Sequence, residues 1–425
     1  MKKIIFKLSF LILYITLHQL CQVDLKAQSG WFWQTDTSFV DNLMKSVYFV
    51  NPQTGWIVGD GPEMGRICRT TNGGINWISQ SNGITNNLYC VKFTDPLKGW
   101  AVGNFGNILK TTNAGDNWIL QFSGISNCFY SVCFLDSLNG WVVGSSGKIM
   151  KTTNGGLNWL TQTSTTTNNL NSICFSDSAT GYVVGNGGKI LKTTNGGLNW
   201  FSLISGTTYG LNSVQFINQQ TGFIVGGDGT VYSQNIILKT INSGINWFYQ
   251  FNSTTDILYS VCFINSQIGW AVGMNGRVVR TSDGGNNWII QSNITTRFLA
   301  SVHFVNQYTG WIVGDYGTIL KTTNGGSVYI KINSIKIPNN YILKQNYPNP
   351  FNPTTNIKFD IPENSFVKLK VFNILGIEIG KFVNEKLNAG SYSVDWEASQ
   401  FPSGVYFYRL EANEFTDTKR MLLVK

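Results

Sequence analysis

The chain has 425 residues and a formal net charge of +9; only 12% of its residues are charged, whereas 45 are glycine and 14 are tryptophan. This composition favours many short strands joined by tight turns over helices or disorder. The positive charge is spread evenly, because residues 1–28, 29–326 and 327–425 each contribute +3. Nucleic-acid binding needs a dense basic patch that displaces counterions, so we expect no nucleic-acid partner.

Residues 1–28 have the pattern of a secretory signal peptide. Lys2 and Lys3 precede an apolar run, and "LKAQ" offers a cleavage point near Ala27. Cys21 leaves a lipoprotein open as an alternative, although Leu20 stands where a lipobox has a small residue. No later run reaches about 18 apolar residues, so the sequence predicts no transmembrane span in the mature chain.

A repeat organises the next 300 or so residues, with a period typical of solenoids and propellers. Tryptophans are spaced 41, 41, 41, 47 and 41 residues apart, from Trp77 to Trp288; Trp33 lies 44 residues before them and Tyr329 follows by 41. Each of seven units offers four short strands: a ("SVxF"), b ("GWxVG"), c ("xILKT") and d, which we expect to begin at the tryptophan.

A four-stranded unit of this length is typical of a propeller blade. The predicted fold class is therefore all-β, with a seven-bladed β-propeller over 29–330 followed by a small antiparallel β-sandwich. The strand from Trp33 or the strand from Tyr329 would close the last blade.

The turn between strands c and d matches the Asp-box pattern S/T-x-D-x-G-x-x-W. Its acid position and tryptophan are Asn72 and Trp77, Asn113 and Trp118, Asn154 and Trp159, Asn195 and Trp200, Asn242 and Trp247, Asp283 and Trp288, and Asn324 in a degenerate copy. Asn and Asp bond to nearby backbone amides, glycine supplies positive φ, and tryptophan fills core. A feature that occurs seven times indicates a scaffold rather than a catalytic site.

One basic column stands before this turn in every unit: Arg69, Lys110, Lys151, Lys192, Lys239, Arg280 and Lys321. In a closed ring these residues would share one rim and could attract anionic partners. The alternative is that they are solvated strand ends whose alkyl stems cover apolar surface.

A second column stands at the start of strand a, the innermost strand of a propeller: Lys45, Tyr89, Tyr130, Asn171, Asn212 and Tyr259, with Ala300 in the seventh unit. These residues are our candidates for contact with a protein, peptide or glycan ligand. The alternative is the lining of a water-filled channel.

The sequence contains few residues of the types that catalysis would need. Sialidase-type chemistry needs an arginine cluster, a tyrosine nucleophile and a glutamate, yet residues 29–326 hold one glutamate, Glu63, and few arginines. His303 is the one histidine after the signal peptide. We therefore expect no catalytic residue, metal or cofactor, and keep a glycoside hydrolase built on an aspartate pair as the least favoured alternative.

The cysteines after the signal peptide are Cys68, Cys90, Cys128, Cys133, Cys174 and Cys262. Their even count permits disulfides in an exported chain, but their spacing shows no framework. Cys133, Cys174 and Cys262 share one repeat position, which holds Tyr48, Lys92, Gln215 and His303 in the other units. We interpret these three as small buried thiols.

The phrase "GWxVGxxGxILKTTNGGxNW", over about residues 31–330, resembles the photosystem II stability/assembly-factor family of seven-bladed propellers. This resemblance implies the fold and a tendency to bind protein, since that family assists the assembly of a membrane complex. The favoured interpretation is a monomeric, non-catalytic binding or scaffold propeller. An assembly factor or chaperone for surface or membrane complexes is the second interpretation.

Residues 331–341 have the composition of a linker, and residues 342–425 alternate as in a small sandwich, for example in "VKLKVFNI". The segment resembles the type A sorting domain of the type IX secretion system at Asn346, Tyr347, Pro348, Asn349, Pro350, Phe351, Gly376, Pro402, Gly404 and Tyr406. The resemblance implies a bacterium of the Bacteroidota, Sec export, and then passage of the outer membrane by the type IX machinery. The product would be secreted or held on the cell surface.

Overall fold

The computed structural model describes residues 30–34, 42–61, 65–84, 86–228, 235–250, 256–291, 295–323, 325–326, 331–334, 337–398 and 401–425. One compact unit spans Phe32–Gly326, and a second holds Ser327–Lys425. The predicted signal peptide, Glu63, Asn324 and Tyr329 lie outside the described residues. No helix within these ranges has the length and apolarity needed to cross a membrane.

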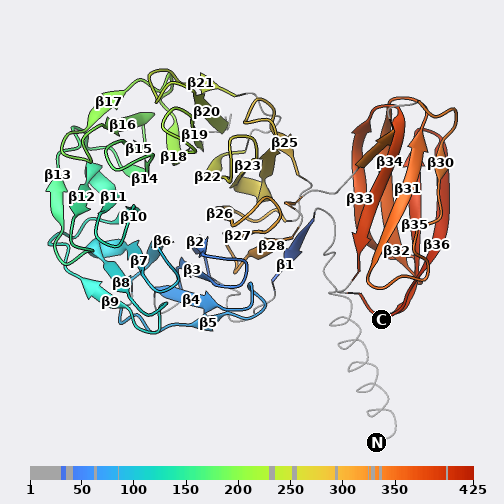
Figure 1. Ribbon diagram of the computed structural model, residues 1–425, viewed down its shortest axis with the longest axis horizontal. Coiled ribbons are helices and arrows are strands. Elements are labelled where there is room, and N and C mark those ends of the chain that lie inside the picture. The colour runs from blue at the N-terminus through green and yellow to red at the C-terminus, as the bar shows by residue number, and fades with distance from the viewer. Residues whose placement is uncertain are drawn as a thin grey trace, which may run out of the picture. The chain divides into compact units, whose positions relative to one another are not determined.

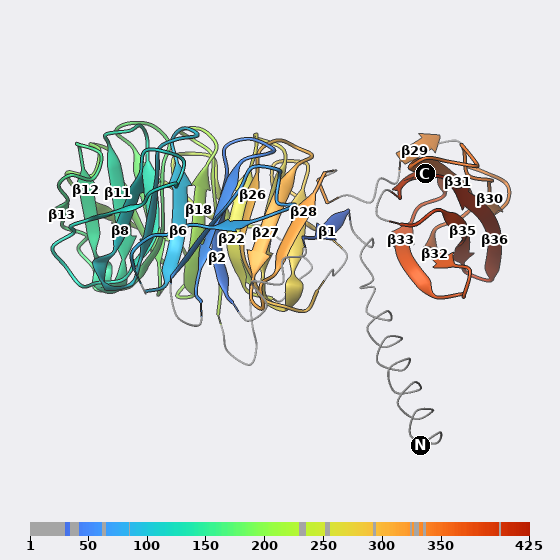
Figure 2. The ribbon, with the colours of Figure 1, turned by 90° about the horizontal axis from the view of Figure 1, so that it is seen from below.

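Seven four-stranded antiparallel sheets form a ring in the first unit (Figure 1), which confirms the all-β, seven-bladed prediction. Seen edge-on, the strands run between the two faces of the ring (Figure 2). Strands a to d of blades 1 to 3 are β2 (Met44–Phe49), β3 (Gly55–Gly59), β4 (Arg66–Thr70) and β5 (Ile78–Ser79); β6 (Leu88–Phe93), β7 (Gly99–Gly103), β8 (Ile108–Thr111) and β9 (Ile119–Gln121); β10 (Phe129–Phe134), β11 (Gly140–Gly144), β12 (Ile149–Thr152) and β13 (Leu160–Gln162).

Blades 4 to 6 repeat the same order. They contain β14 (Leu170–Phe175), β15 (Gly181–Gly185), β16 (Lys189–Thr193) and β17 (Phe201–Leu203); β18 (Gly210–Phe216), β19 (Gly222–Gly227), β20 (Asn235–Thr240) and β21 (Phe248–Tyr249); β22 (Leu258–Phe263), β23 (Gly269–Gly273), β24 (Val278–Thr281) and β25 (Ile289–Ile290). Short 3-10 turns join strands b and c in three blades: η2 (Asn104–Gly106), η3 (Ser145–Gly147) and η4 (Met274–Gly276). Strand d begins one residue after the Asp-box tryptophan rather than at it, because the tryptophan still belongs to the turn.

The seventh blade combines β26 (Leu299–Phe304), β27 (Gly310–Gly314) and β28 (Ile319–Thr322) with the N-terminal strand β1 (Trp31–Trp33). The backbone N–H of Gln34 donates to Ile319 O at 2.9 Å, as Gln80 N–H donates to Ile67 O at 2.8 Å in blade 1. This register makes Trp31, which is fully buried, the equivalent of Trp77, and corrects the expectation that Trp33 holds that place.

Aromatic stacks hold neighbouring blades together. The aromatic residue of strand b lies face to face with the phenylalanine that ends strand a of the next blade, with centroids 3.4–3.9 Å apart at all seven interfaces. In one of them Phe93 stacks on Trp56 and meets Trp118 edge-on at 5.9 Å. A Cβ on Gly99 would lie 2.6 Å from the Phe93 ring, which explains the glycine of the "GW" motif.

The serine of the "SVxF" motif links the innermost strands around the ring. Ser131 Oγ accepts from Ile173 N–H at 3.3 Å, and Ser172 Oγ accepts from Val214 N–H at 3.2 Å. The same bond recurs from Ser46, Ser213, Ser260 and Ser301 to the next blade. Blade 2 has Cys90 in place of the serine.

The second unit is an antiparallel sandwich of two four-stranded sheets, as predicted. One contains β29 (Lys331–Ser334), β34 (Gly390–Glu397), β31 (Thr354–Ile361) and β30 (Ile342–Leu343), and the other β33 (Glu378–Leu387), β32 (Ser365–Asn373), β35 (Gly404–Ala412) and β36 (Phe415–Leu423). The sheets enclose one apolar core that includes Trp396, Tyr408 and Ile357. The stretch expected to be a linker thus begins with a strand, β29, paired with β34.

Candidate functional site

The Asp-box turns bond internally in the same way in all six copies whose acid position is described. In blade 3, Thr152 Oγ1 accepts from Gly156 N–H at 2.9 Å, and Asn154 Oδ1 accepts from Asn158 N–H at 2.9 Å. Asp283, the one true acid, makes the equivalent bond to Asn287 N–H at 2.9 Å. These side chains make their hydrogen bonds within the hairpin that they close, so we regard the turns as structural elements and look elsewhere for a ligand site.

The basic column before these turns packs against the aromatic stacks. Each ammonium or guanidinium lies 5.3–6.0 Å from the ring of the strand-b aromatic in its own blade, an example being Lys151 over Trp141 at 5.3 Å. Lys151 Nζ also donates to Gly196 O at 2.7 Å, and Lys192 Nζ donates to Ser243 O at 2.8 Å. Both acceptors belong to the Asp-box turn of the next blade.

These contacts give the basic column a role between blades. Burial lowers the pKa of Lys192 and of Lys321, as expected for ammonium groups held against apolar rings. Arg69 Nη1 likewise reaches Asp116 Oδ1 of the next blade at 3.0 Å. The anion-binding role considered from the sequence stays a prediction.

Replacing Lys151 with methionine tests this role, because methionine keeps the apolar stem and removes the charged donor. We expect Lys151→Met to lower the free energy of unfolding by about 1 kcal/mol, from the lost cation–π contact and the lost bond to Gly196 O. Urea unfolding measures the change. Lys148→Met is the matched control, since no bond of the Lys148 side chain is found among the described residues. Equal effects of the two substitutions would contradict the inter-blade role.

The second column, at the start of strand a, coincides with a β-bulge in every blade. In blade 2, Leu88 pairs with Gly103 and Cys90 pairs with Val102, so Tyr89 is the extra residue. The corresponding register shifts fall at Lys45, Tyr130, Asn171, Asn212, Tyr259 and Ala300. A bulge re-aims its side chain and often stands beside functional sites. We call these seven bulge residues the mouth of the central channel.

On one side of the mouth, the side chains of successive blades contact each other. Lys45 Nζ lies 3.6 Å from Asp60 Oδ2 and 5.6 Å from the centroid of Tyr89. The Tyr89 and Tyr130 rings meet edge to face at 5.3 Å. Burial first, and then nearby groups including Cys128, raise the pKa of Tyr89 and that of Tyr130. Both phenols therefore remain neutral donors. This arc presents aromatic faces together with hydroxyl donors.

The mouth residues of blades 4 to 6 are two asparagines and a tyrosine. Asn171 Nδ2 donates to Asn186 Oδ1 and to Leu211 O, both at 2.9 Å. Asn212 Nδ2 donates to Leu258 O at 2.9 Å. Tyr259 meets Phe298 edge to face at 4.7 Å. The structure therefore brings all six sequence-predicted candidates to one rim, where their contacts run from blade to blade.

The residue after strand b contacts the mouth in blades 1 and 4, where Asp60 meets Lys45 and Asn186 meets Asn171, and sequence reasoning missed it. Asp60 pairs with the bulge residue of blade 1, whereas Asp315 stands in blade 7, whose bulge residue is Ala300. Burial raises the pKa of both carboxyls, and neither Asp60 Oδ1 nor Asp315 Oδ1 has a hydrogen-bond partner among the described residues. The available signal was the variable residue that follows the repeated "GWxVG".

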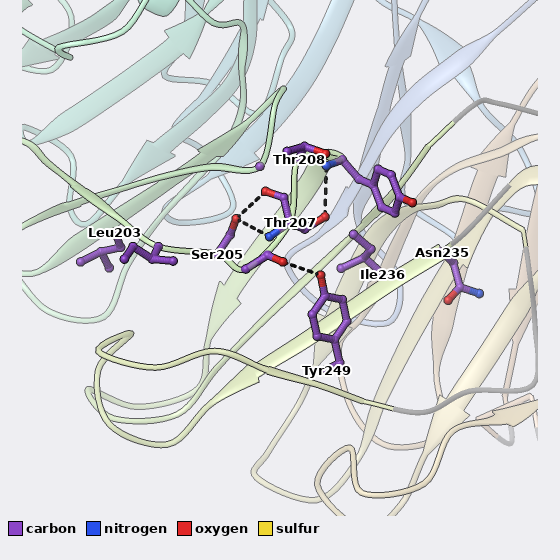
Figure 3. A pocket seen from close by; sticks show the side chains of 11 residues that line it. Leu203, Ser205, Thr207, Thr208, Asn235, Ile236 and Tyr249 are labelled. Carbon is purple, nitrogen blue, oxygen red and sulfur yellow. Dashed lines mark hydrogen bonds between the residues drawn. The ribbon is translucent and has the colours of Figure 1, made fainter. Parts of the chain in front are cut away.

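Hollows repeat on this face beside the d–a loops of blades 2, 3 and 4. The one in Figure 3 has a volume of about 740 Å3 and takes Tyr249 and Asn235 from blade 5 as a wall. Its floor is a turn in which Ser205 Oγ donates to Thr207 O at 3.0 Å, and Tyr249 Oη donates to Gly206 O at 3.1 Å. Ser123 and Ser164 make the same turn beside cavities of about 740 and 650 Å3. Because they recur, these hollows mark the blade repeat rather than one site.

The sorting-motif residues of the second unit are mostly structural. Asn346 is buried; its backbone N–H donates to Tyr408 Oη at 2.7 Å, and its Nδ2 donates to Pro348 O at 3.1 Å. Phe351 and Tyr406 pack on Trp396 with centroids 5.3 and 5.5 Å away. The exposed members include Tyr347, Asn349 and Pro402. In the described part of the whole chain, no group of three or more His, Cys, Asp or Glu side chains is placed to hold a metal ion.

Seven Asp-box blades, closed by an N-terminal strand and followed by a sandwich, define a seven-bladed β-propeller protein with an appended C-terminal domain. Residues 25–121, 119–207 and 238–345 match the family described as photosynthesis system II assembly factor YCF48. The chain belongs to this family. Residues 345–425 match the secretion system C-terminal sorting domain, which indicates secretion or an outer-surface location.

Solved structures share the fold. "YCF48 bound to D1 peptide" is 19% identical, with a TM-score of 0.58 over 70% of this chain and 99% of that one. PorZ of Porphyromonas gingivalis, titled a surface component of the type IX secretion system, is 12% identical, with a TM-score of 0.50 over 92% and 60%. An ancestral GH74 enzyme is 14% identical, with a TM-score of 0.54 over 90% and 60%. A search of curated sequences found no match.

Proposed function

We propose that this chain is an exported, non-catalytic propeller that binds a peptide or glycan at the mouth of its central channel. The arrangement of the bulge residues is the observation that carries this proposal. Tyr89, Tyr130 and Tyr259 stand at bulges of the innermost strands, and hydroxyl, amide and carboxylate groups belong to the same rim. Aromatic faces next to convergent polar groups are typical of sites that recognise peptides and sugars.

Replacing Tyr89, Tyr130 and Tyr259 together with alanine tests the mouth. We expect binding to peptide and glycan arrays made from the surface of the native bacterium to weaken at least about tenfold, as when interface aromatics are truncated. Alanine at the exposed Tyr308 and Tyr347 is the control. Array binding that survives the triple substitution would refute the mouth as the site.

The export route is the second part of the proposal. Residues 1–28 would direct Sec export, and residues 342–425 would then address the protein to the type IX machinery of a bacterium of the Bacteroidota. The support is the match of residues 345–425 to the sorting-domain family. The mature protein would act as a monomer, either secreted or held on the cell surface.

Family membership favours a second candidate, an assembly factor for surface or membrane complexes. One solved structure of similar fold is titled "YCF48 bound to D1 peptide". An assembly factor would engage unfinished membrane proteins transiently, whereas a scaffold would hold its ligand stably. Crosslinking in growing cells followed by a chase separates the two, because partners of an assembly factor disappear as complexes mature.

Because an ancestral GH74 enzyme shares the fold, a glycosidase remains the least favoured candidate. Its acid and base would have to come from carboxyls with raised pKa near the mouth, such as Asp60 and Asp315. Hydrolysis of β-glucans or sialosides that is abolished by Asp60→Asn or Asp315→Asn would replace the binding proposal with a catalytic one.

A further inference from the structure

A second set of side chains lines the central channel below the mouth. It consists of the residue before the last phenylalanine of each strand a, and we call it the channel ring: Tyr48, Lys92, Cys133, Cys174, Gln215, Cys262 and His303. The ring stands three residues along the strand from the mouth, or about 10 Å deeper. Lys92 is exposed and all the others except Cys262 are partly exposed, although the valine and phenylalanine on either side of Lys92 are buried. The ring side chains other than Cys262 therefore face solvent inside the channel.

Lys92 is the only residue of the channel ring that carries a charge. Burial first, and then Lys92, lower the pKa of His303 to about 3, so its imidazole is neutral and Nε2–H donates to Phe49 O at 2.9 Å. Burial raises the pKa of the Cys133 thiol to about 12 and raises that of Cys174 and Cys262. Gln215 bonds through both amide atoms to the backbone of Phe263.

The Lys92 ammonium has no ion pair within the described residues. Its Nζ lies 4.9 Å from the centroid of Tyr48, and no carboxylate belongs to the ring. A positive charge in a narrow protein-lined passage attracts anions more strongly than one on an open surface.

The neighbours of Lys92 complete an anion site. The Tyr48 hydroxyl and the neutral Cys133 thiol can donate to an anion, whereas the Cys174 thiol already donates to Phe175 O at 3.8 Å. We propose that the channel ring binds an anionic group, a carboxylate or an inorganic oxyanion, on Lys92. This site goes beyond the proposed mouth, because it would operate whether or not a peptide or glycan binds above it.

The thiols of the ring supply a direct test in the purified full-length protein. Methanethiosulfonates of similar size can carry either a sulfonate or a trimethylammonium group, and peptide mass spectrometry reads the modification of Cys133 and Cys174. We expect the anionic reagent to react at least about tenfold faster than the cationic one, because one nearby unit charge favours it. Lys92→Gln should abolish the preference and Lys92→Arg should keep it.

Lys98→Gln is the matched control, because it removes the same charge from an exposed loop residue that pairs with Asp95 at 3.8 Å. Added acetate and added phosphate separate the two sources of the anion: protection of the thiols by acetate alone indicates a carboxylate, and protection by phosphate an oxyanion. Equal rates for the two reagents, a preference that survives Lys92→Gln, or no protection by either anion would each overturn the proposal. Loss of the mouth ligand in the tyrosine variant would leave this result unchanged.

Discussion

Truncating a strand-b tryptophan is expected to destabilise the propeller severely. Trp100 is fully buried, stacks on Phe134 of the next blade at 3.6 Å, and lies under Lys110 at 5.6 Å. Its Nε1–H also points at Gly155 O, 3.4 Å away. Trp100→Ala would open a large cavity at a blade interface, and we expect the free energy of unfolding to fall by about 3–5 kcal/mol. Urea unfolding of the full chain, followed by circular dichroism, measures this change.

Two companion substitutions make that prediction specific. Leu120→Ala removes an exposed apolar side chain of strand d and should change the free energy by no more than about 0.5 kcal/mol. Trp100→Phe keeps the stack, and blade 5 already has Phe223 at this place, stacked on Phe263 at 3.9 Å. We expect it to cost about 1 kcal/mol, as moderate changes of core volume do. If Trp100→Ala unfolded at the same urea concentration as Leu120→Ala, the stacks would not be what joins the blades.

The seven-fold ring could be predicted from the sequence because each blade repeats residues whose physical roles are local. The "GWxVG" phrase pairs a glycine that leaves room for a ring with the aromatic that stacks on the next blade. The Thr-x-Asn-x-Gly turn is satisfied by its own hydrogen bonds. Such features need no knowledge of distant residues, so strands b and c fall where the pattern puts them.

Features that depend on register or on the neighbouring blade could not be predicted. Trp31 and Trp33 point to the same side of one strand, so spacing alone could not decide which of them is the equivalent of Trp77. The hydrogen bond from Gln34 N–H to Ile319 O decides it. The bulges at the mouth are visible only in the pairing of strands a and b. The column at the start of strand a was identified from the repeat, but the bulge at each of its positions was not.

The exposure of the channel-ring side chains is another feature that the sequence could not predict. The sequence placed Cys133, Cys174 and Cys262 at one repeat position and predicted buried thiols; Cys262 is buried, whereas Cys133 and Cys174 are partly exposed. Strand a has a core-facing side and a channel-facing side, and the alternation of one strand cannot distinguish a core from a narrow channel. Only the closed ring turns this position into a lining with Lys92 as its one charge.

Removing residues 342–425 is expected to abolish release of the propeller from cells that carry the type IX machinery. Residues 342–425 supply β30 to β36 of the sandwich, and its edge strand β29 precedes them. Within the segment, Asn346 and Tyr406 pack in the core, and Asn349 Oδ1 accepts from Leu422 N–H of the last strand. The propeller unit spans Phe32–Gly326, so the deletion leaves its strands intact. We expect the truncated protein to be folded and confined to the periplasm, measured by fractionation and immunoblotting against the full chain.

Transfer of the sandwich gives the complementary result. Residues 331–425, which include β29, fused to an unrelated periplasmic protein should carry that protein out of the cell, because an address that folds independently acts on any attached cargo. Fusion of a segment with Phe351→Ala and Tyr406→Ala is the control, since both side chains pack on Trp396 and their loss should disrupt the sandwich core. Release of the truncated propeller at the normal level, or retention of the wild-type fusion, would show that export information lies elsewhere in the chain.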